Sequence, residues 1–288
     1  MPFKYSSLKI IVQPSNHRCY QDQEYEEQGA FINEDLSECD LILGVKEIET
    51  SVLLESKSYM FFSHTCKIQP DNSAAAQGTP GMDKKELLRE ILKKNISLID
   101  YENIRDDMSR RYLGFGRFAG IIGCYNSLNL YLETIGKEFM PRAYQLGSYE
   151  RLKEHIMYQD FQNAKIIVTG DGRVAKGTLE FLKFSNINQI SPSEFIKNNY
   201  SSSVFCNLQT SNYVKHKDNK EFDLQHFIKS PNMYISDLEN FLPYATMLIS
   251  SHYWDPKSPR LFEKKNIQQY NQHAHLFLYL LLGLFLTI

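Results

Sequence analysis

The chain has 288 residues, enough for two domains of ordinary size, and its 42% hydrophobic and 23% charged residues are typical of a globular protein. A formal net charge of -2 gives no reason to expect a nucleic-acid partner or an anionic membrane surface. The five cysteines are widely spaced and form no CxxC pair, which predicts reduced thiols in the cytoplasm and no metal site.

Short apolar runs alternate with helical patterns in the first half of the chain. The helical pattern of residues 83–95 begins at Asp83, a residue type suited to capping, and carries four apolar residues on one face. Alternation of this kind predicts an α/β fold with a mostly parallel sheet. The other predicted elements are a helix over 21–29 and strands over 8–12, 41–45, 59–62 and 96–99.

The middle of the chain breaks this rhythm. Residues 73–82 are small and polar, which predicts a surface loop. Residues 118–135 form the pattern of a long helix that connects the two halves, and residues 140–162 are interpreted as an inter-domain segment. The GFGR sequence at 114–117 follows no apolar run of strand length, so we interpret it as a glycine-rich helix start rather than a nucleotide-binding turn.

The sequence IIVTGDGRVAKG at 166–177 is the most informative motif. A β-branched apolar run leads into Gly170 and Gly172, and an amphipathic pattern follows from Arg173 and Val174 onward. A buried parallel strand that turns tightly into a helix has this pattern, and the helix N-terminus would offer its N–H groups to a pyrophosphate. The motif predicts a dinucleotide site over the alternative of a merely tight turn, with Ala175 in the third position of the fingerprint.

The second half continues the alternation of strands and helices. Strands are predicted over 187–190 and 246–250, and a helix is predicted over 237–244. The last of these strands ends at Ser251 and His252, and His252 is a candidate cofactor contact. Ile190 is followed by Ser191, so no acid at that strand tip is available to hold a ribose diol, which leaves NAD and NADP both open.

A lysine and a histidine each follow a predicted strand in the first half. Lys46 lies just after the run LILGV, and His64 lies just after YMFFS. Because ligand groups collect beyond the carboxyl ends of parallel strands, these side chains could share a site and move protons at an amine or imine. Spacing alone favours an exposed lysine and a capping histidine over such a pair. It also allows a solvated Lys67 and indicates no nucleophilic role for Cys66.

Five sequences occur in an order that resembles a known family: CDLILGVKE, YMFFSHTCKIQP, NISLIDYENI, GFGRFAGIIGCYN and IIVTGDGRVAKG. They resemble the lysine-forming saccharopine dehydrogenases, which are related to alanine dehydrogenase and to the N-terminal region of transhydrogenase. The same motifs occur in the lysine–ketoglutarate reductase part of the bifunctional lysine-degrading enzyme. The resemblance extends over roughly residues 9–266.

The resemblance implies two Rossmann-like domains, with NAD on the second and an amino-acid substrate in the cleft between them. It implies oxidation of the secondary amine of saccharopine to an imine, which water cleaves to lysine and 2-oxoglutarate, as in lysine biosynthesis. The acid–base pair of the family carries over onto Lys46 in GVKE and His64 in FSHT. The alternatives are an alanine dehydrogenase-like enzyme and a catalytically inactive fragment that binds a nucleotide or a partner. The oligomeric state is left open.

The chain departs from the family pattern at both ends. It lacks the family's first arginine-bearing segment, and Arg18 is no obvious substitute. We therefore expect a substrate domain over 1–135, an incomplete NAD(P)-binding domain over 136–272, and a non-native apolar tail over 273–288. The thirteen residues LFLYLLLGLFLTI would form a helix of about 20 Å, too short for a membrane core of about 30 Å, so we expect no membrane anchor.

Overall fold

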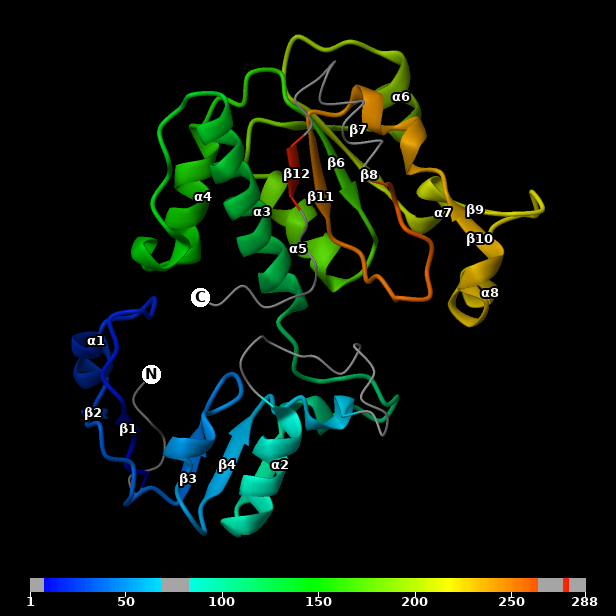
Figure 1. Ribbon diagram of the computed structural model, residues 1–288. Coiled ribbons are helices and arrows are strands. Elements are labelled where there is room, and N and C mark those ends of the chain that lie inside the picture. Colours follow the sequence, from blue (N-terminus) through cyan, green and yellow to red (C-terminus); the bar gives the residue numbers. More distant parts are fainter. Residues whose placement is uncertain (1–7, 69–82, 264–276, 280–288) are drawn as a thin grey trace. The chain divides into compact units, whose positions relative to one another are not determined.

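The computed structural model describes residues 8–68, 83–263 and 277–279, so the predicted loop at 73–82 lies outside the described residues (Figure 1). The chain divides into two compact units after Gly114. The sequence placed the domain boundary after residue 135, behind the long helix α3 (Gly116–Thr134), whereas the compact units divide ahead of it. The reason is that α3 packs against helix α5 (Arg173–Leu182) of the second unit.

A three-stranded parallel sheet, in the order β3-β4-β5, forms the centre of the first unit (Figure 1). The strands alternate apolar residues toward a small core, where Tyr59 and Phe61 pack with Leu87 and Ile91 of helix α2. Asp83 caps this helix as predicted, because its carboxylate accepts a hydrogen bond from the Lys85 N–H at 2.8 Å. The elements are β3 (Leu41–Leu43), β4 (Ser58–Phe61), β5 (Ser97–Asp100) and α2 (Lys84–Lys93).

A smaller parallel pair precedes this sheet. Strands β1 (Ile11–Val12) and β2 (Phe31–Ile32) pair in parallel, and the acidic helix α1 (Asp22–Glu27) lies between them in sequence. The sequence predicted the first strand and the helix but not β2, because a two-residue strand is too short to show a period of its own.

A five-stranded parallel sheet, in the order β12-β11-β6-β8-β7, organises the second unit (Figure 1). The buried residues of strands β6 and β8 are apolar except for Thr169, as expected for a parallel sheet covered on both faces. The prediction of an α/β fold with mostly parallel sheets is confirmed. The strands are β6 (Lys165–Thr169), β7 (Asn188–Ile190), β8 (Val204–Leu208), β11 (Met247–Ser250) and β12 (Phe277–Tyr279).

The strand order fixes where a ligand can bind in the second unit. The chain leaves β6 toward β8 and β7 on one side, and later crosses to β11 on the other side of β6. In open parallel sheets, the crevice at the carboxyl ends of two such strands is the usual ligand site. Strand β8, rather than β7, lies beside β6, which differs from the usual order of a nucleotide-binding half, in which the second strand neighbours the first.

Helices α3 and α5 cross at very short distance because each contributes a glycine to the contact. A Cβ atom on Gly120 would lie 2.0 Å from the Val174 carbonyl oxygen, and one on Gly177 would lie 2.0 Å from the Arg117 carbonyl oxygen. The GFGR sequence begins α3, which starts at Gly116, as its interpretation as a helix start predicted.

Two segments of the second unit differ from their predictions. Residues 237–244 form two separate 3-10 turns, Leu238–Asn240 and Leu242–Tyr244, rather than one helix, because Pro243 has no N–H to donate. The segment at 140–162 contains the helix α4 (Tyr149–Met157), which Ser148 caps and whose Leu152 and Ile156 are buried. The remaining elements are α6 (Pro192–Lys197), α7 (Thr210–Tyr213), β9 (Val214–His216), α8 (Leu224–Lys229) and β10 (Tyr234–Ser236), of which β9 and β10 pair antiparallel.

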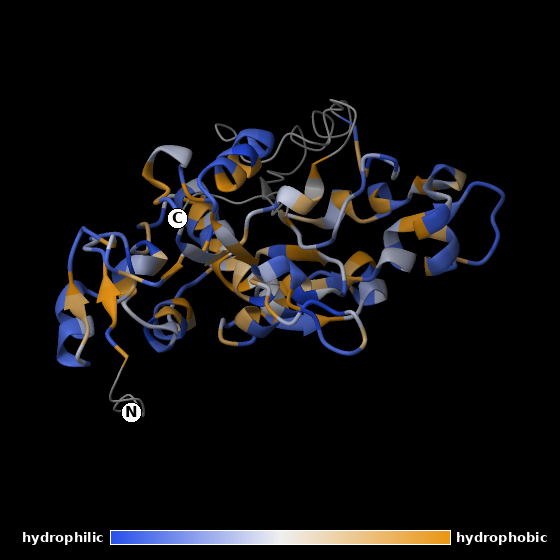
Figure 2. Cartoon of the chain, turned by 90° about the horizontal axis from the view of Figure 1, so that it is seen from below, coloured by the Kyte–Doolittle hydropathy of each residue, from blue (hydrophilic) through white to orange (hydrophobic). Residues whose placement is uncertain are grey.

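The distribution of hydrophobic residues agrees with the burial expected from the fold. In Figure 2 the helices carry both hydrophilic and hydrophobic stretches, as expected of helices with one face on a core. In the part of the chain that the structure describes, no helix is both long enough and apolar enough to cross a membrane. Within the apolar tail, Phe277–Tyr279 pair with β11 as the edge strand β12, and the rest of the tail lies outside the described residues. The proposal that the tail is non-native stays a prediction.

Candidate active site

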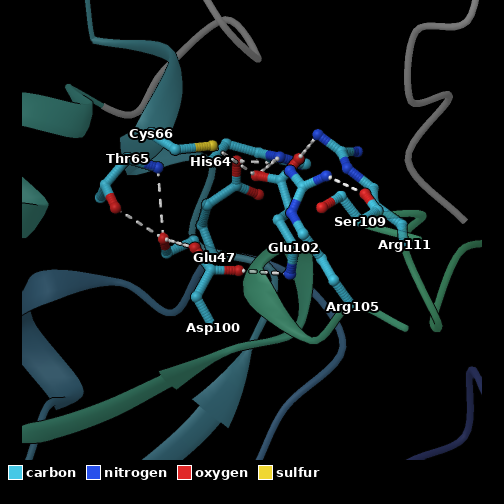
Figure 3. A network of polar contacts seen from close by, with 10 residues as sticks. Glu47, His64, Thr65, Cys66, Asp100, Glu102, Arg105, Ser109 and Arg111 are labelled. Carbon is cyan, nitrogen blue, oxygen red and sulfur yellow. Dashed lines mark hydrogen bonds and ion pairs between the residues drawn. The ribbon is translucent and has the colours of Figure 1, made fainter. Parts of the chain in front are cut away.

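Three titratable side chains from the loops after β3, β4 and β5 meet at one edge of the first unit's sheet (Figure 3). They are Glu47, His64 and Glu102. The Nδ1 atom of His64 lies 2.9 Å from Oε2 of Glu102, and its Nε2 atom lies 3.8 Å from Oε1 of Glu47. Since parallel strands end at the same edge, the sheet itself brings these loops together.

Hydrogen bonds fix the two loops that carry His64 and Glu102. Ser63 Oγ donates to Asp100 Oδ2 at 2.5 Å and lies 2.8 Å from Thr65 Oγ1, while Asp100 Oδ1 accepts from the Glu102 N–H at 2.8 Å. His64 itself has a φ of 54°, in the left-handed region that non-glycine residues seldom occupy. Such a conformation persists only where the surroundings enforce it, and it is concentrated at functional sites.

Glu102 is a buried carboxylate whose partners include His64, Arg111 and Cys66. Only 1% of its side chain is exposed, and a charge so deeply buried needs compensation. Its Oε1 lies 2.9 Å from Arg111 Nη2, and its Oε2 accepts from Cys66 Sγ at 3.4 Å as well as facing His64. Arg105 pairs with Arg111 in an isolated β-bridge and donates to the Ser109 carbonyl at 2.8 Å, which holds the loop that carries Arg111.

The pairing with Glu102 sets which nitrogen of His64 is basic. An ionised carboxylate can only accept hydrogen bonds, so Nδ1 of His64 carries the hydrogen, and Nε2 holds the lone pair in the neutral ring. His64 can therefore accept and release a proton through Nε2.

Lys46 lies at the same edge as His64, after β3, and directly precedes Glu47 in the chain. Burial lowers the pKa of the Lys46 ammonium, and the neighbouring carboxylate of Glu47 opposes this shift. A lysine with a lowered pKa is a better proton acceptor near neutral pH than an ordinary surface lysine. The two residues predicted as acid and base thus follow neighbouring strands of one sheet.

Glu47, Glu102 and Arg111 were not predicted as site residues from the sequence. The signal was available for the two glutamates, because each follows closely on the end of a strand. Glu47 lies four residues after β3, in GVKE, and Glu102 lies two residues after β5, in LIDYENI. Arg111 is far along an irregular loop, where no periodicity points to the sheet edge.

We expect Glu102→Gln to lower turnover, because an amide can turn an N–H toward Nδ1 of His64 and then no longer fixes the hydrogen on that nitrogen. The amide keeps the size of the side chain, so the packing around it should change little. The measurement is kcat, with Glu86→Gln, on the exposed first turn of α2, as a matched control. A parental kcat in Glu102→Gln would show that this carboxylate does not orient His64.

The predicted dinucleotide turn lies at the end of β6 in the second unit. Gly170 has a φ of 101°, and a Cβ atom there would lie 3.0 Å from the Cα atom of His252, so only glycine fits without strain. Gly172 is the N-cap of α5, no side chain caps this helix, and a Cβ atom on Gly172 would meet nothing within 4 Å. Open space beside the start of a ten-residue helix fits a pyrophosphate, and Arg173 and Val174 are the first residues of that helix.

His252 follows β11 and lies against this turn. Its Nδ1 atom is 2.8 Å from Thr169 Oγ1 and 3.2 Å from Ser250 Oγ, and its ring contacts that of Tyr213. Burial lowers the pKa of His252 to about 4, so the imidazole is neutral at physiological pH. The structure thus brings His252 to the predicted glycines, and its role toward a cofactor stays a prediction.

We also searched the described residues for clusters of side chains that could bind a metal ion. No group of three or more histidine, cysteine or acidic side chains in the described ranges is arranged to hold a metal ion.

A family model matches the first part of the chain, and a solved structure matches most of it. Residues 3–122 match the model of the alanine dehydrogenase/PNT N-terminal domain family. The structure also superposes on a solved L-alanine dehydrogenase, over 91% of this chain and 62% of the dehydrogenase chain, with a TM-score of 0.50. At 13% sequence identity this similarity shows a common fold alone.

Curated relatives cover most of this chain but are much longer than it. Alpha-aminoadipic semialdehyde synthase of Bos taurus, named as mitochondrial, is 32% identical over 284 residues, which is 90% of this chain and 29% of the relative. The synthase of Arabidopsis thaliana is 30% identical over 300 residues, which is 90% of this chain and 27% of the relative. Residues 3–122 therefore match the alanine dehydrogenase/PNT N-terminal domain family, and the chain is similar, over both of its units, to less than a third of the length of alpha-aminoadipic semialdehyde synthase.

Proposed function

We propose that the chain is an NAD(P)-dependent oxidoreductase that acts on the CH–NH group of an amino acid. The proposed substrate is saccharopine, which is converted with water to lysine and 2-oxoglutarate. The observation that carries the proposal is the similarity to alpha-aminoadipic semialdehyde synthase over 90% of the chain, across both the titratable cluster and the glycine turn.

The turn after β6 supports the choice of cofactor. Gly170 and Gly172 would let the pyrophosphate approach the main chain, the first turn of α5 at Arg173 and Val174 would donate to it, and neutral His252 would flank it. When bound, the nicotinamide accepts or returns a hydride at the carbon that bears the nitrogen. NAD is the proposed cofactor, and NADP remains an alternative.

Lys46 and His64 would supply the proton transfers. Oxidation of a secondary amine requires removal of the proton on its nitrogen, and cleavage of the resulting imine requires a proton to leave the attacking water and another to reach the departing amine. Two groups that can take up and release a proton meet these needs, and we propose Lys46, whose pKa burial lowers, and His64 through Nε2 for these roles. The same groups serve the reverse reaction.

The proposed compartment is the cytoplasm, as the wide spacing of the five cysteines led us to expect. The bovine relative is itself named as a mitochondrial protein.

We expect Gly172→Val to weaken NADH binding at least tenfold while leaving the fold intact. The valine side chain would occupy the open space beside the start of α5, where a pyrophosphate would lie, yet it meets no protein atom within 4 Å at its Cβ. Calorimetric titration of NADH and NADPH into the parent and the variant provides the measurement, with circular dichroism as the folding control.

Two outcomes of this titration count against the proposal. If the parent chain binds neither NADH nor NADPH, the proposed function is wrong. If Gly172→Val binds as tightly as the parent, the nucleotide lies elsewhere on the molecule.

A further inference from the structure

A pocket of about 570 Å³ opens at the carboxyl ends of β7 and β8 in the second unit. Its size falls within the range of small-molecule sites. Polar side chains dominate its lining, from the segment after β7 and from the end of β8 with helix α7 behind it. The polar lining residues are Gln189, Ser191, Glu194, Asn207, Gln209 and Asn212.

Asn207 connects this pocket to the dinucleotide turn. It lies in β8, the strand beside β6, and its Nδ2 atom donates to the carbonyl oxygen of Gly170 at 2.9 Å and to that of Val168 at 3.1 Å. A side chain that lines the pocket therefore also holds the glycine turn where the pyrophosphate would lie. In a dinucleotide the adenosine ribose is the group next to the pyrophosphate.

The amide of Asn207 has one atom left for a ligand. Its two N–H bonds are both used by the main chain of β6 and the turn, whereas no hydrogen bond is recorded to its Oδ1 atom among the described residues. An amide oxygen is an acceptor with two lone pairs, and ribose hydroxyls are donors. In the usual dinucleotide fold the ribose acceptor is a carboxylate at the tip of the second strand, and here Ser191 follows β7 instead.

Glu194, the acid that lines the pocket, is engaged elsewhere. Its Oε2 atom accepts from the Ser191 hydroxyl at 2.6 Å and from the Ser191 N–H at 2.9 Å, in a capping box at the start of α6. These hydrogen bonds lower the pKa of Glu194 and hold its carboxylate against the helix start.

We infer that the adenosine ribose of the nucleotide binds in this pocket, with a ribose hydroxyl donating to Oδ1 of Asn207. The inference rests on the proposed function. It places ribose recognition on the strand next to β6, where the order β6-β8-β7 brings Asn207, and not on the tip of β7. The neutral amide oxygen of Asn207 would accept the hydrogen bond that a carboxylate accepts from the ribose in the usual dinucleotide fold.

The test is the affinity of the whole chain for ADP, 2′-deoxy-ADP and 3′-deoxy-ADP, measured by calorimetry in the parent, in Asn207→Leu and in Asn188→Leu. The parent should lose about fivefold in affinity when the recognised hydroxyl is removed, the usual worth of one neutral hydrogen bond. Asn207→Leu should bind ADP about fivefold more weakly and bind the three nucleotides alike. Asn188 is exposed on β7 and does not line the pocket, so Asn188→Leu should behave as the parent.

The outcomes separate the inference from the proposed function. If the parent binds ADP and both deoxy analogues equally, or if Asn207→Leu still distinguishes them, Asn207 does not read the ribose, although nucleotide binding stands. If the parent binds neither ADP nor NADH, the proposed function fails and the inference fails with it. Should Asn207→Leu not fold, Asn207→Ala, which also removes Oδ1, is compared with the parent on the same three nucleotides, and the same outcomes apply.

Discussion

Replacing Lys46 with methionine, or His64 with glutamine, is expected to lower turnover of saccharopine roughly 10²–10⁴-fold, the usual worth of a general acid or base. Methionine matches the length of lysine without a titratable group, and glutamine keeps a polar side chain that takes up no proton near neutral pH. Lys46→Arg should be nearly as inactive, because a guanidinium stays protonated and cannot serve as a base.

Matched controls separate this loss from general damage. Lys93 on α2 is exposed and pairs with Glu90 at its surface, and His17 is exposed, so Lys93→Met and His17→Gln should keep parental turnover. Because His64 has a left-handed backbone, His64→Asn, which tolerates that conformation, is the second variant. A change confined to KM would make Lys46 and His64 binding residues, and an unchanged kcat would remove them from the site.

The second large effect is expected in stability. Gly120→Ala would place a methyl group 2.0 Å from the Val174 carbonyl oxygen and 2.7 Å from the Thr178 nitrogen, so α3 and α5 must separate. Both contacts are with backbone, which cannot rotate away. We expect the free energy of unfolding to fall by about 3 kcal/mol, the upper end of the usual cost of overpacking, which would lower the Tm by about 6–12 °C in a unit of this size.

Thermal unfolding followed by circular dichroism provides the measurement. Gly177→Ala should behave in the same way, since its Cβ would lie 2.0 Å from the Arg117 carbonyl oxygen. Gly172→Ala, where a Cβ meets nothing within 4 Å, should change the Tm by no more than about 2 °C, as expected of a substitution that creates no clash. Equal Tm values for Gly120→Ala and the parent would mean that the two helices do not cross as closely as described.

Local pattern was sufficient for the elements that surround the two candidate sites. The apolar runs before Lys46 and His64, the capped helix at Asp83 and the glycine turn after β6 all carry a strong period or a distinctive residue type. Prediction was weaker for short elements, and where the order of the strands in the sheet differs from their order in the sequence. The neighbouring position of β8 and β6 depends on long-range pairing, which no local pattern encodes.

The site was predicted less completely than the fold. Lys46 and His64 stand out because each follows a strand, but the carboxylates that face His64 come from loops whose meeting depends on the sheet. Asn207 was not predicted as a site residue because its hydrogen bonds to two carbonyl oxygens of the neighbouring segment depend on the pairing of β8 with β6. The sequence alone does not predict that pairing. The close glycine contacts of α3 and α5 likewise need the tertiary structure.

The most direct test of the proposed function is nicotinamide reduction by the purified chain, followed by absorbance, with saccharopine or L-alanine as substrate and NAD or NADP as acceptor. The proposal predicts reduction that depends on saccharopine, releases lysine and 2-oxoglutarate in equal amounts, and is lost in Lys46→Met. Reduction with L-alanine but not with saccharopine, or no reduction with either by a folded chain that binds NADH, would contradict it.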